Sequence, residues 1–243
     1  MSTYAISDLH GNMKLWNQMK NFLNSDDKLY CLGDCADRGA DGWEIIKDVL
    51  RMVDKGQARY IRGNHEQMLM DALHDYFQYD GMMDYSFMLL CQNGGQKTFE
   101  DATNDPWLED WLRMLNRLTI PYASIVNENK EKLFLSHAGI SWEQIPHFTN
   151  NDFDKDAELK HYLTKDLQWS REHIGEQYIP CDIDIQVFGH TPIQYIVPKD
   201  KWNDEMLGAF WVNNHQVDID NGTIKSGTAV MLDLDTFDEH IFS

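Results

Sequence analysis

The densest group of chemically active side chains in this 243-residue chain lies in a short motif between two glycines. The motif spans residues 33–39 and contains two carboxylates and one guanidinium: Asp34, Asp37 and Arg38. Carboxylates bind divalent cations, and a guanidinium can hold two phosphate oxygens at once. Because Asp, Gly and Arg are also ordinary loop residues, the motif by itself fits a solvated turn equally well.

Candidate metal ligands recur in further motifs along the chain. The set comprises two aspartates, three histidines and one asparagine: Asp8, His10, Asp34, Asn64, His137 and His190. A mixture of carboxylates, imidazoles and an amide suits Mn²⁺, Fe²⁺ or Zn²⁺, and it suits neither an all-oxygen calcium site nor a thiolate zinc site. Six ligands exceed the need of one ion with an open position, whereas two ions that share a carboxylate would use them all.

Three of these motifs follow predicted strands, over residues 3–6, 28–32 and 58–61. The polar turns recur at Asp8, Asp34 and Asn64, which are 26 and 30 residues apart, and each turn precedes a helical pattern. This spacing fits βαβ units and a parallel sheet. Since the carboxyl ends of parallel strands share one edge of a sheet, where α/β proteins bind ligands, we expect the motifs to meet there.

The rest of the chain is predicted as a helical middle and a β-rich second half. Residues 75–119 carry an amphipathic stripe typical of helices, and the segment 92–98 is interpreted as a connecting loop rather than a substrate contact. The acidic stretch 150–165 is predicted to be an exposed insertion with a short helix. Further strands are expected at 122–126, 132–136, 185–188, 217–219 and 228–234, with a hairpin between the first two and a turn at 221–222 between the last two.

The composition disfavours several classes of function. Forty acidic and 21 basic residues give a net charge of −19, which repels nucleic acids and anionic lipid surfaces. The four cysteines show neither a disulfide framework nor paired zinc spacing. Because no secretory signal and no long apolar segment is apparent, we expect a cytoplasmic protein with no membrane partner and no nucleic-acid partner.

Five motifs together resemble those of the calcineurin-like metallophosphoesterases: 8–11, 33–39, 63–66, 136–139 and 189–191. They are most similar to the bacterial branch of the PPP-type serine/threonine phosphatases, which also includes bis(5′-nucleosyl)-tetraphosphatases. Ser7 and Ala138 stand where this family usually has glycine, but both lie beside ligands rather than at them. The resemblance implies an α/β fold over 1–243 as one domain, with two mixed β-sheets packed as a sandwich, flanking helices and a helical insertion at about 75–119.

The resemblance also implies two divalent ions, with Mn²⁺ as the first expectation and Fe or Zn as alternatives. Asp8 and His10 would hold the first ion, and Asp34 would bridge both ions. The second ion would be held by Asn64, His137 and His190.

The remaining roles concern the substrate. His65 would act as the general acid, oriented by Asp37, and phosphate would be bound by Arg38, Asn64 and Arg171. These residue types suit the task, because an imidazolium can protonate a leaving oxygen and arginine keeps its charge beside phosphate.

The expected function is a phosphomonoesterase that acts on phosphoserine or phosphothreonine in proteins, or on phosphotyrosine, by attack of a metal-bridging hydroxide. A symmetrical bis(5′-nucleosyl)-tetraphosphatase, or another small-molecule phosphoesterase on the same site, is the alternative. A catalytically silent metal-binding module is a third hypothesis, disfavoured because neither a ligand nor His65 is missing. No oligomeric state is predicted.

Other titratable residues are interpreted as structural. Asp218 and Asp220 are expected to be ordinary strand and turn residues, and Cys35 a small core residue. The same holds for the histidines outside the motifs: His74, His147, His161, His173, His215 and His240.

Overall fold

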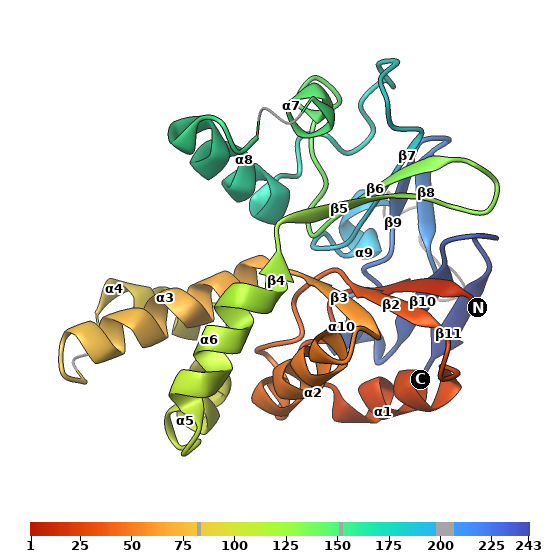
Figure 1. The fold of residues 1–243 in the computed structure, drawn as a ribbon. Helices are drawn as coiled ribbons and strands as arrows, with labels where there is room; N and C mark the ends of the chain where they lie inside the picture. The colour runs from red at the N-terminus through yellow and green to blue at the C-terminus, as the bar shows by residue number, and fades with distance from the viewer. Residues whose placement is uncertain (82–83, 151–152, 198–206) are drawn as a thin grey trace.

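The computed structural model describes residues 1–81, 84–150, 153–197 and 207–243, and their strands form two mixed β-sheets (Figure 1). The first sheet has the order β11-β10-β1-β2-β3-β4. The neighbouring strands β1 to β4 run parallel, whereas β10 and β11 are antiparallel. The strand bounds are Thr3–Ile6 (β1), Lys28–Cys31 (β2), Ala58–Ile61 (β3), Thr119–Ile120 (β4), Ala229–Asp233 (β10) and Glu239–Phe242 (β11).

The second sheet has the order β5-β6-β7-β9-β8, with β6, β7 and β9 parallel and both edge strands antiparallel. Successive side chains along a strand point to opposite faces, so each strand can place one set of apolar side chains between the two sheets. Ala5 of β1 and Leu133 and Leu135 of β6 share one apolar core between the sheets. The strand bounds are Tyr122–Val126 (β5), Lys132–Ser136 (β6), Ile185–Phe188 (β7), Phe210–Asn213 (β8) and Gln216–Asp218 (β9).

Helices cover the outer faces of both sheets (Figure 1). Tyr4 and Ile6, which point away from Ala5, pack with the apolar faces of the first six helices. On the other side, Phe134 of β6 packs against α7 and α8. The helix bounds are Met13–Phe22 (α1), Gly42–Asp54 (α2), Asn64–Gln78 (α3), Tyr85–Gln92 (α4), Gln96–Thr103 (α5), Leu108–Leu118 (α6), Ile145–Thr149 (α7), Ala157–Trp169 (α8), Ile193–Ile196 (α9) and Thr223–Ser226 (α10).

The predicted architecture of two mixed sheets with flanking helices is confirmed, and the predicted helical middle contains the end of α3 together with α4, α5 and α6. Three local predictions differ from the structure. Helix α5 begins within the predicted loop 92–98, and α8 is longer than the short helix expected in 150–165, of which 151–152 lie outside the described residues. The predicted turn at 221–222 leads directly into α10, of which Gly222 is the N-cap, and the flanking strands β9 and β10 belong to different sheets.

Five motifs lie directly after β1, β2, β3, β6 and β7. Strands β1, β2 and β3 run parallel to one another in the first sheet, and β6 runs parallel to β7 in the second. Their carboxyl ends therefore bring the motifs to one side of the sandwich, as the spacing predicts. None of the helices in the described ranges combines the length and the apolar character that crossing a membrane requires.

Asp105 joins the helical insertion to α2, and its removal is expected to destabilise the fold. Its Oδ2 accepts hydrogen bonds from Trp43 Nε1 (3.0 Å) and Lys47 Nζ (2.8 Å). Asp105→Ala leaves Trp43 Nε1 without its partner and Lys47 with Glu44 alone, so we expect the free energy of unfolding in urea to fall by about 1–3 kcal/mol. Asp110→Ala, which removes an exposed carboxylate on α6, is the control, and equal losses in the two variants would contradict this anchor.

Candidate metal centre

The backbone of the motifs adopts a left-handed conformation that residues other than glycine rarely adopt. Positive φ angles between 45° and 69° occur at six candidate site residues: Asp8, His10, Asp34, Asp37, Arg38 and His190. Such conformations cost on the order of 1 kcal/mol each and persist only where the surrounding structure enforces them. Two glycines allow the necessary close packing, since a Cβ at Gly39 would lie 2.2 Å from the His10 carbonyl oxygen and one at Gly63 would lie 2.2 Å from Asp34 Oδ1.

Asp34 is at the centre of the cluster, with imidazoles on both sides of its carboxylate. Its Oδ1 lies 3.3 Å from His137 Nε2, and its Oδ2 lies 3.9 Å from His10 Nε2 and 3.7 Å from His65 Nε2. Among the residues that the structure describes, two buried groups could hold a metal ion, and both include Asp34: one with His10 and His65, the other with His137 and His190. This geometry is what a carboxylate shared by two ions requires.

The other two predicted ligands, Asp8 and Asn64, lie in the same cluster. Asp8 Oδ1 is 3.7 Å from His10 Nε2, and Asn64 Oδ1 is 2.9 Å from His137 Nε2. Asp8 Oδ2 accepts hydrogen bonds from the Ser7 hydroxyl and from the His190 amide. The structure thus brings all six predicted ligands together, although the first metal-capable group contains His65, the predicted general acid, and not Asp8.

The orientation of the imidazoles fits metal binding. Nδ1 of His10 donates to the Ala36 carbonyl (3.0 Å) and Nδ1 of His137 donates to the Leu32 carbonyl (2.7 Å), which directs Nε2 of each ring toward Asp34. The buried Nε2 of His190 has no hydrogen-bond partner among the residues that the structure describes. An unpaired imidazole nitrogen beside carboxylates is a position that a divalent cation would satisfy, so the donor set fits the expected ions.

Burial and neighbouring charges shift the pKa values of the histidines in the cluster. Burial lowers the pKa of His10 to about 3 and that of His190 to about 2, which leaves both rings neutral with a free lone pair. Burial acts in the same direction on His137, but the charges of Asp34 and Asp8 outweigh it and raise the His137 pKa to about 10. The buried carboxylates therefore need positive charge beside them, which a bound cation would supply.

His65, Asp37 and Arg38 form a second arrangement next to Asp34. His65 Nδ1 lies 2.7 Å from Asp37 Oδ2, and both side chains are fully buried. The Arg38 guanidinium donates to Nε2 of His10 (2.8 Å) and to Nε2 of His65 (2.9 Å). A guanidinium at the mouth of the cluster is well placed to meet an incoming anion.

Glu66, for which the sequence predicts no role, holds the motif 33–39 in place. Its two carboxylate oxygens accept four backbone N–H groups, from Gly63 (3.0 Å), Asp34 (2.8 Å), Cys35 (2.9 Å) and Ala36 (3.2 Å). Its position in the sequence could have predicted this contact. Glu66 is the third residue of α3 after the N-cap Gly63, where an acidic side chain typically reaches back to backbone amides.

The segment 92–98 also supports this motif. The Gly94 carbonyl accepts the Arg38 amide (2.9 Å), and Thr98 Oγ1 accepts the Asp37 amide (3.1 Å). Residues 93–95 connect α4 to α5, and the segment in addition fixes the backbone of Asp37 and Arg38.

A pocket of about 590 Å³ adjoins the cluster and carries three cationic side chains: Arg38, Arg171 and Lys225. Its wall also includes Asp220, which was expected to be an ordinary turn residue. Burial and the charge of Asp8 raise the pKa of Asp220 well above its usual range. Tyr195 and Lys225 belong to none of the sequence motifs, and only the fold brings them to the pocket.

The fold and the buried cluster are those of a known family of phosphoesterases. The chain belongs to the calcineurin-like phosphoesterase family, whose model matches residues 1–219. This family uses a dinuclear site for divalent metal ions, and the buried His and Asp groups around Asp34 could form it.

Curated relatives are named as dinucleoside tetraphosphatases. The symmetrical bis(5′-nucleosyl)-tetraphosphatase of Buchnera aphidicola is 31% identical over 147 residues, which cover 58% of this chain and 45% of that protein. The match thus spans about half the length of this relative. The asymmetrical bis(5′-nucleosyl)-tetraphosphatase PrpE of Oceanobacillus iheyensis is 25% identical over 249 residues, covering 92% of this chain and 85% of that protein.

Solved structures share the fold. The cold-active protein tyrosine phosphatase of Shewanella sp. superimposes with a TM-score of 0.60 at 16% identity, covering 100% of this chain and 80% of that one. A putative diadenosine tetraphosphatase gives a TM-score of 0.55 at 14% identity, covering 99% of this chain and 92% of that one.

Glu66→Gln tests whether the Glu66 carboxylate holds the motif 33–39 in place, because an amide offers one acceptor oxygen where the carboxylate offers two. The amide nitrogen would face backbone N–H groups, so we expect the free energy of unfolding in urea to fall by about 1–3 kcal/mol. Displacement of the Asp34 backbone should also weaken Mn²⁺ binding, measured by calorimetric titration. Glu100→Gln on the exposed side of α5 is the control, and a Glu66 variant with wild-type stability and Mn²⁺ affinity would contradict this role.

Proposed function

We propose that this protein hydrolyses a phosphoanhydride bond of dinucleoside polyphosphates in a metal-dependent reaction. The observation that carries the proposal is the pocket beside the metal centre, in which Arg38, Arg171 and Lys225 face one space. In a chain with a net charge of −19, three cations around one pocket form a local positive field. Three cations exceed the need of a single phosphate group and suit a chain of phosphates.

Tyr195 adds a site for a nucleobase in the same pocket. Its side chain is 68% exposed, and Lys225 Nζ donates to its hydroxyl (2.7 Å) and lies 4.8 Å from the ring centroid. An exposed aromatic ring is a stacking surface for any base. The names of the curated relatives, which include symmetrical and asymmetrical tetraphosphatases, support this substrate class.

We assign the metal ligands as the sequence predicts. Asp8 and His10 would hold one ion, Asp34 would be shared, and the second ion would be held by Asn64, His137 and His190. When bound, the two ions would supply Lewis-acid activation of the phosphoryl group and of the attacking water.

The other residues position the substrate and move a proton. Arg38, with Arg171 and Asn64, would bind the phosphoryl oxygens, and the Arg38 guanidinium would exchange its contacts with imidazole nitrogens for phosphate. His65 would donate a proton to the leaving oxygen. Burial lowers the pKa of His65, but Asp34 and the hydrogen bond to Asp37 outweigh it and raise that pKa, which favours the protonated ring.

Phosphoprotein phosphatase activity, the first expectation from sequence, is the second candidate. The observation in its favour is the buried His65–Asp37 pair, because the alkoxide of serine or threonine is a poor leaving group that needs a proton donor. Both candidates use the same centre and differ in what the pocket beside it binds.

A substrate panel with defined metals tests the proposal. With Mn²⁺ present we expect kcat/KM for diadenosine tetraphosphate to exceed that for a phosphoserine peptide by at least about tenfold, since the pocket offers three cations and an aromatic ring. EDTA should abolish both activities and Mn²⁺ should restore them. The reverse preference would favour the phosphoprotein candidate, and activity that survives EDTA would contradict the metal-dependent reaction.

His65→Asn tests the proton donor. An alkyl phosphate needs protonation of its leaving oxygen, so we expect its hydrolysis to fall by about 10²–10⁴-fold. The rate with p-nitrophenyl phosphate should fall much less, because nitrophenolate leaves without a proton. Steady-state kinetics on both substrates give the two ratios, and a uniform loss would show that His65 acts in some other way.

A further inference from the structure

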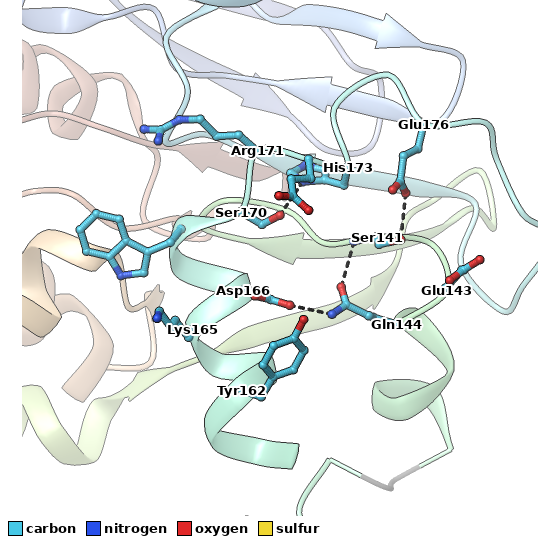
Figure 2. Close-up of a pocket in the computed structure, with 12 residues that line it drawn as sticks. Ser141, Glu143, Gln144, Tyr162, Lys165, Asp166, Ser170, Arg171, His173 and Glu176 are labelled. Atoms are coloured by element: carbon cyan, nitrogen blue, oxygen red, sulfur yellow. Dashed lines mark hydrogen bonds between the residues drawn. The ribbon is translucent and has the colours of Figure 1, made fainter. Parts of the chain in front are cut away.

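A second pocket, of about 620 Å³, opens on the other side of Arg171 (Figure 2). Its walls are the loop 141–144, one face of α8 and the segment 170–176. Arg171 lines both pockets, and the ring of Trp169, from the second pocket, packs edge-on against that of His190, with centroids 6.0 Å apart. Both pockets therefore border the metal centre, and Arg171 lies between them.

The α8 wall presents aromatic and polar side chains on one face of the helix. Tyr162, Lys165, Asp166 and Trp169 follow the i, i+3, i+4, i+7 spacing of one helix face. Leu163 and Leu167 are buried in the core instead. Tyr162 is 57% exposed, and within the described parts of the chain its hydroxyl has no hydrogen-bond partner.

The second pocket carries more carboxylates than cations, which are Lys165 and Arg171, whereas the first carries more cations than carboxylates. Hydrogen bonds from Gln144 to Asp166 (2.6 Å) and from Ser141 to Glu176 (3.0 Å) fix its walls (Figure 2). Glu143 and Glu172 are exposed at its border. Carboxylates repel a phosphate chain but accept hydrogen bonds from hydroxyl and amino groups, so this pocket suits an uncharged ring system with such donors.

We propose that the second pocket binds the second nucleoside of a dinucleoside polyphosphate. Its base would contact Trp169 and Tyr162, and its ribose would face the carboxylates. The phosphate chain would cross Arg171 to the cationic pocket, where Tyr195 meets the first nucleoside. This arrangement rests on the proposed function and deepens it, because only a substrate with two nucleosides needs a ring site on each side of a phosphate-binding arginine.

Tyr162→Ala is the primary test, since the exposed side chain can be removed without affecting the core. The substrates are diadenosine tetraphosphate, with two nucleosides, and adenosine 5′-tetraphosphate, with one. We expect the ratio of their kcat/KM values to fall about tenfold, chiefly through KM for the dinucleoside, as the loss of one base–aromatic contact predicts. Tyr85→Ala, which removes a tyrosine that is 75% exposed on α4, is the matched control and should keep the wild-type ratio.

The outcomes separate this inference from the function on which it rests. Normal hydrolysis of diadenosine tetraphosphate with an unchanged ratio in Tyr162→Ala would overturn the second nucleoside site alone. Wild-type protein that hydrolyses neither nucleotide would overturn the proposed function and this site with it. A loss confined to a basic phosphoserine peptide would assign the pocket to a peptide side chain and overturn the nucleoside assignment. Thermal unfolding of both variants confirms that each is folded.

Discussion

The buried carboxylate of Asp34 is the constraint on which the rest of the site depends. A negative charge that is removed from water must be compensated by nearby positive charge and by hydrogen bonds. Imidazoles from the ends of β1, β3 and β6 approach its two oxygens, at 3.3 to 3.9 Å. The same contacts bring the two sheets of the sandwich together at one edge, so the chemistry of the site and the packing of the sheets share one set of residues.

Bringing the site residues so close together strains the backbone, and contacts from Glu66 and from the segment 92–98 stabilise the strained conformation. Left-handed conformations at Asp34, Asp37 and Arg38 persist because Glu66 gathers four backbone amides and because Gly94 and Thr98 fix the end of the motif. The helical insertion thus has a structural link to the metal centre, although its residues lie outside the motifs.

Charge is distributed unevenly around the centre. The chain is strongly acidic, yet the pocket on one side of Arg171 gathers cations and the pocket on the other side gathers carboxylates. A substrate with a polyanionic middle and uncharged ends matches this separation, because each part meets the group that binds it best. A simple phosphomonoester would use only the centre.

The sequence by itself determined the order of the motifs and their place after strands, because a polar turn between an apolar strand and a helix is a local feature. Asp8, Asp34, Asn64, His137 and His190 were predicted to meet for that reason, and they do. Only the tertiary structure decided where Glu66, Asp220, Tyr195 and Lys225 lie and where the pocket along α8 forms. Each of these residues meets the site through contacts between segments distant in the sequence, and no periodicity in the chain encodes such contacts. Long-range pairing likewise decided that β9 and β10 belong to different sheets. A turn signal at 221–222 predicts local geometry and does not determine which strand the next one pairs with.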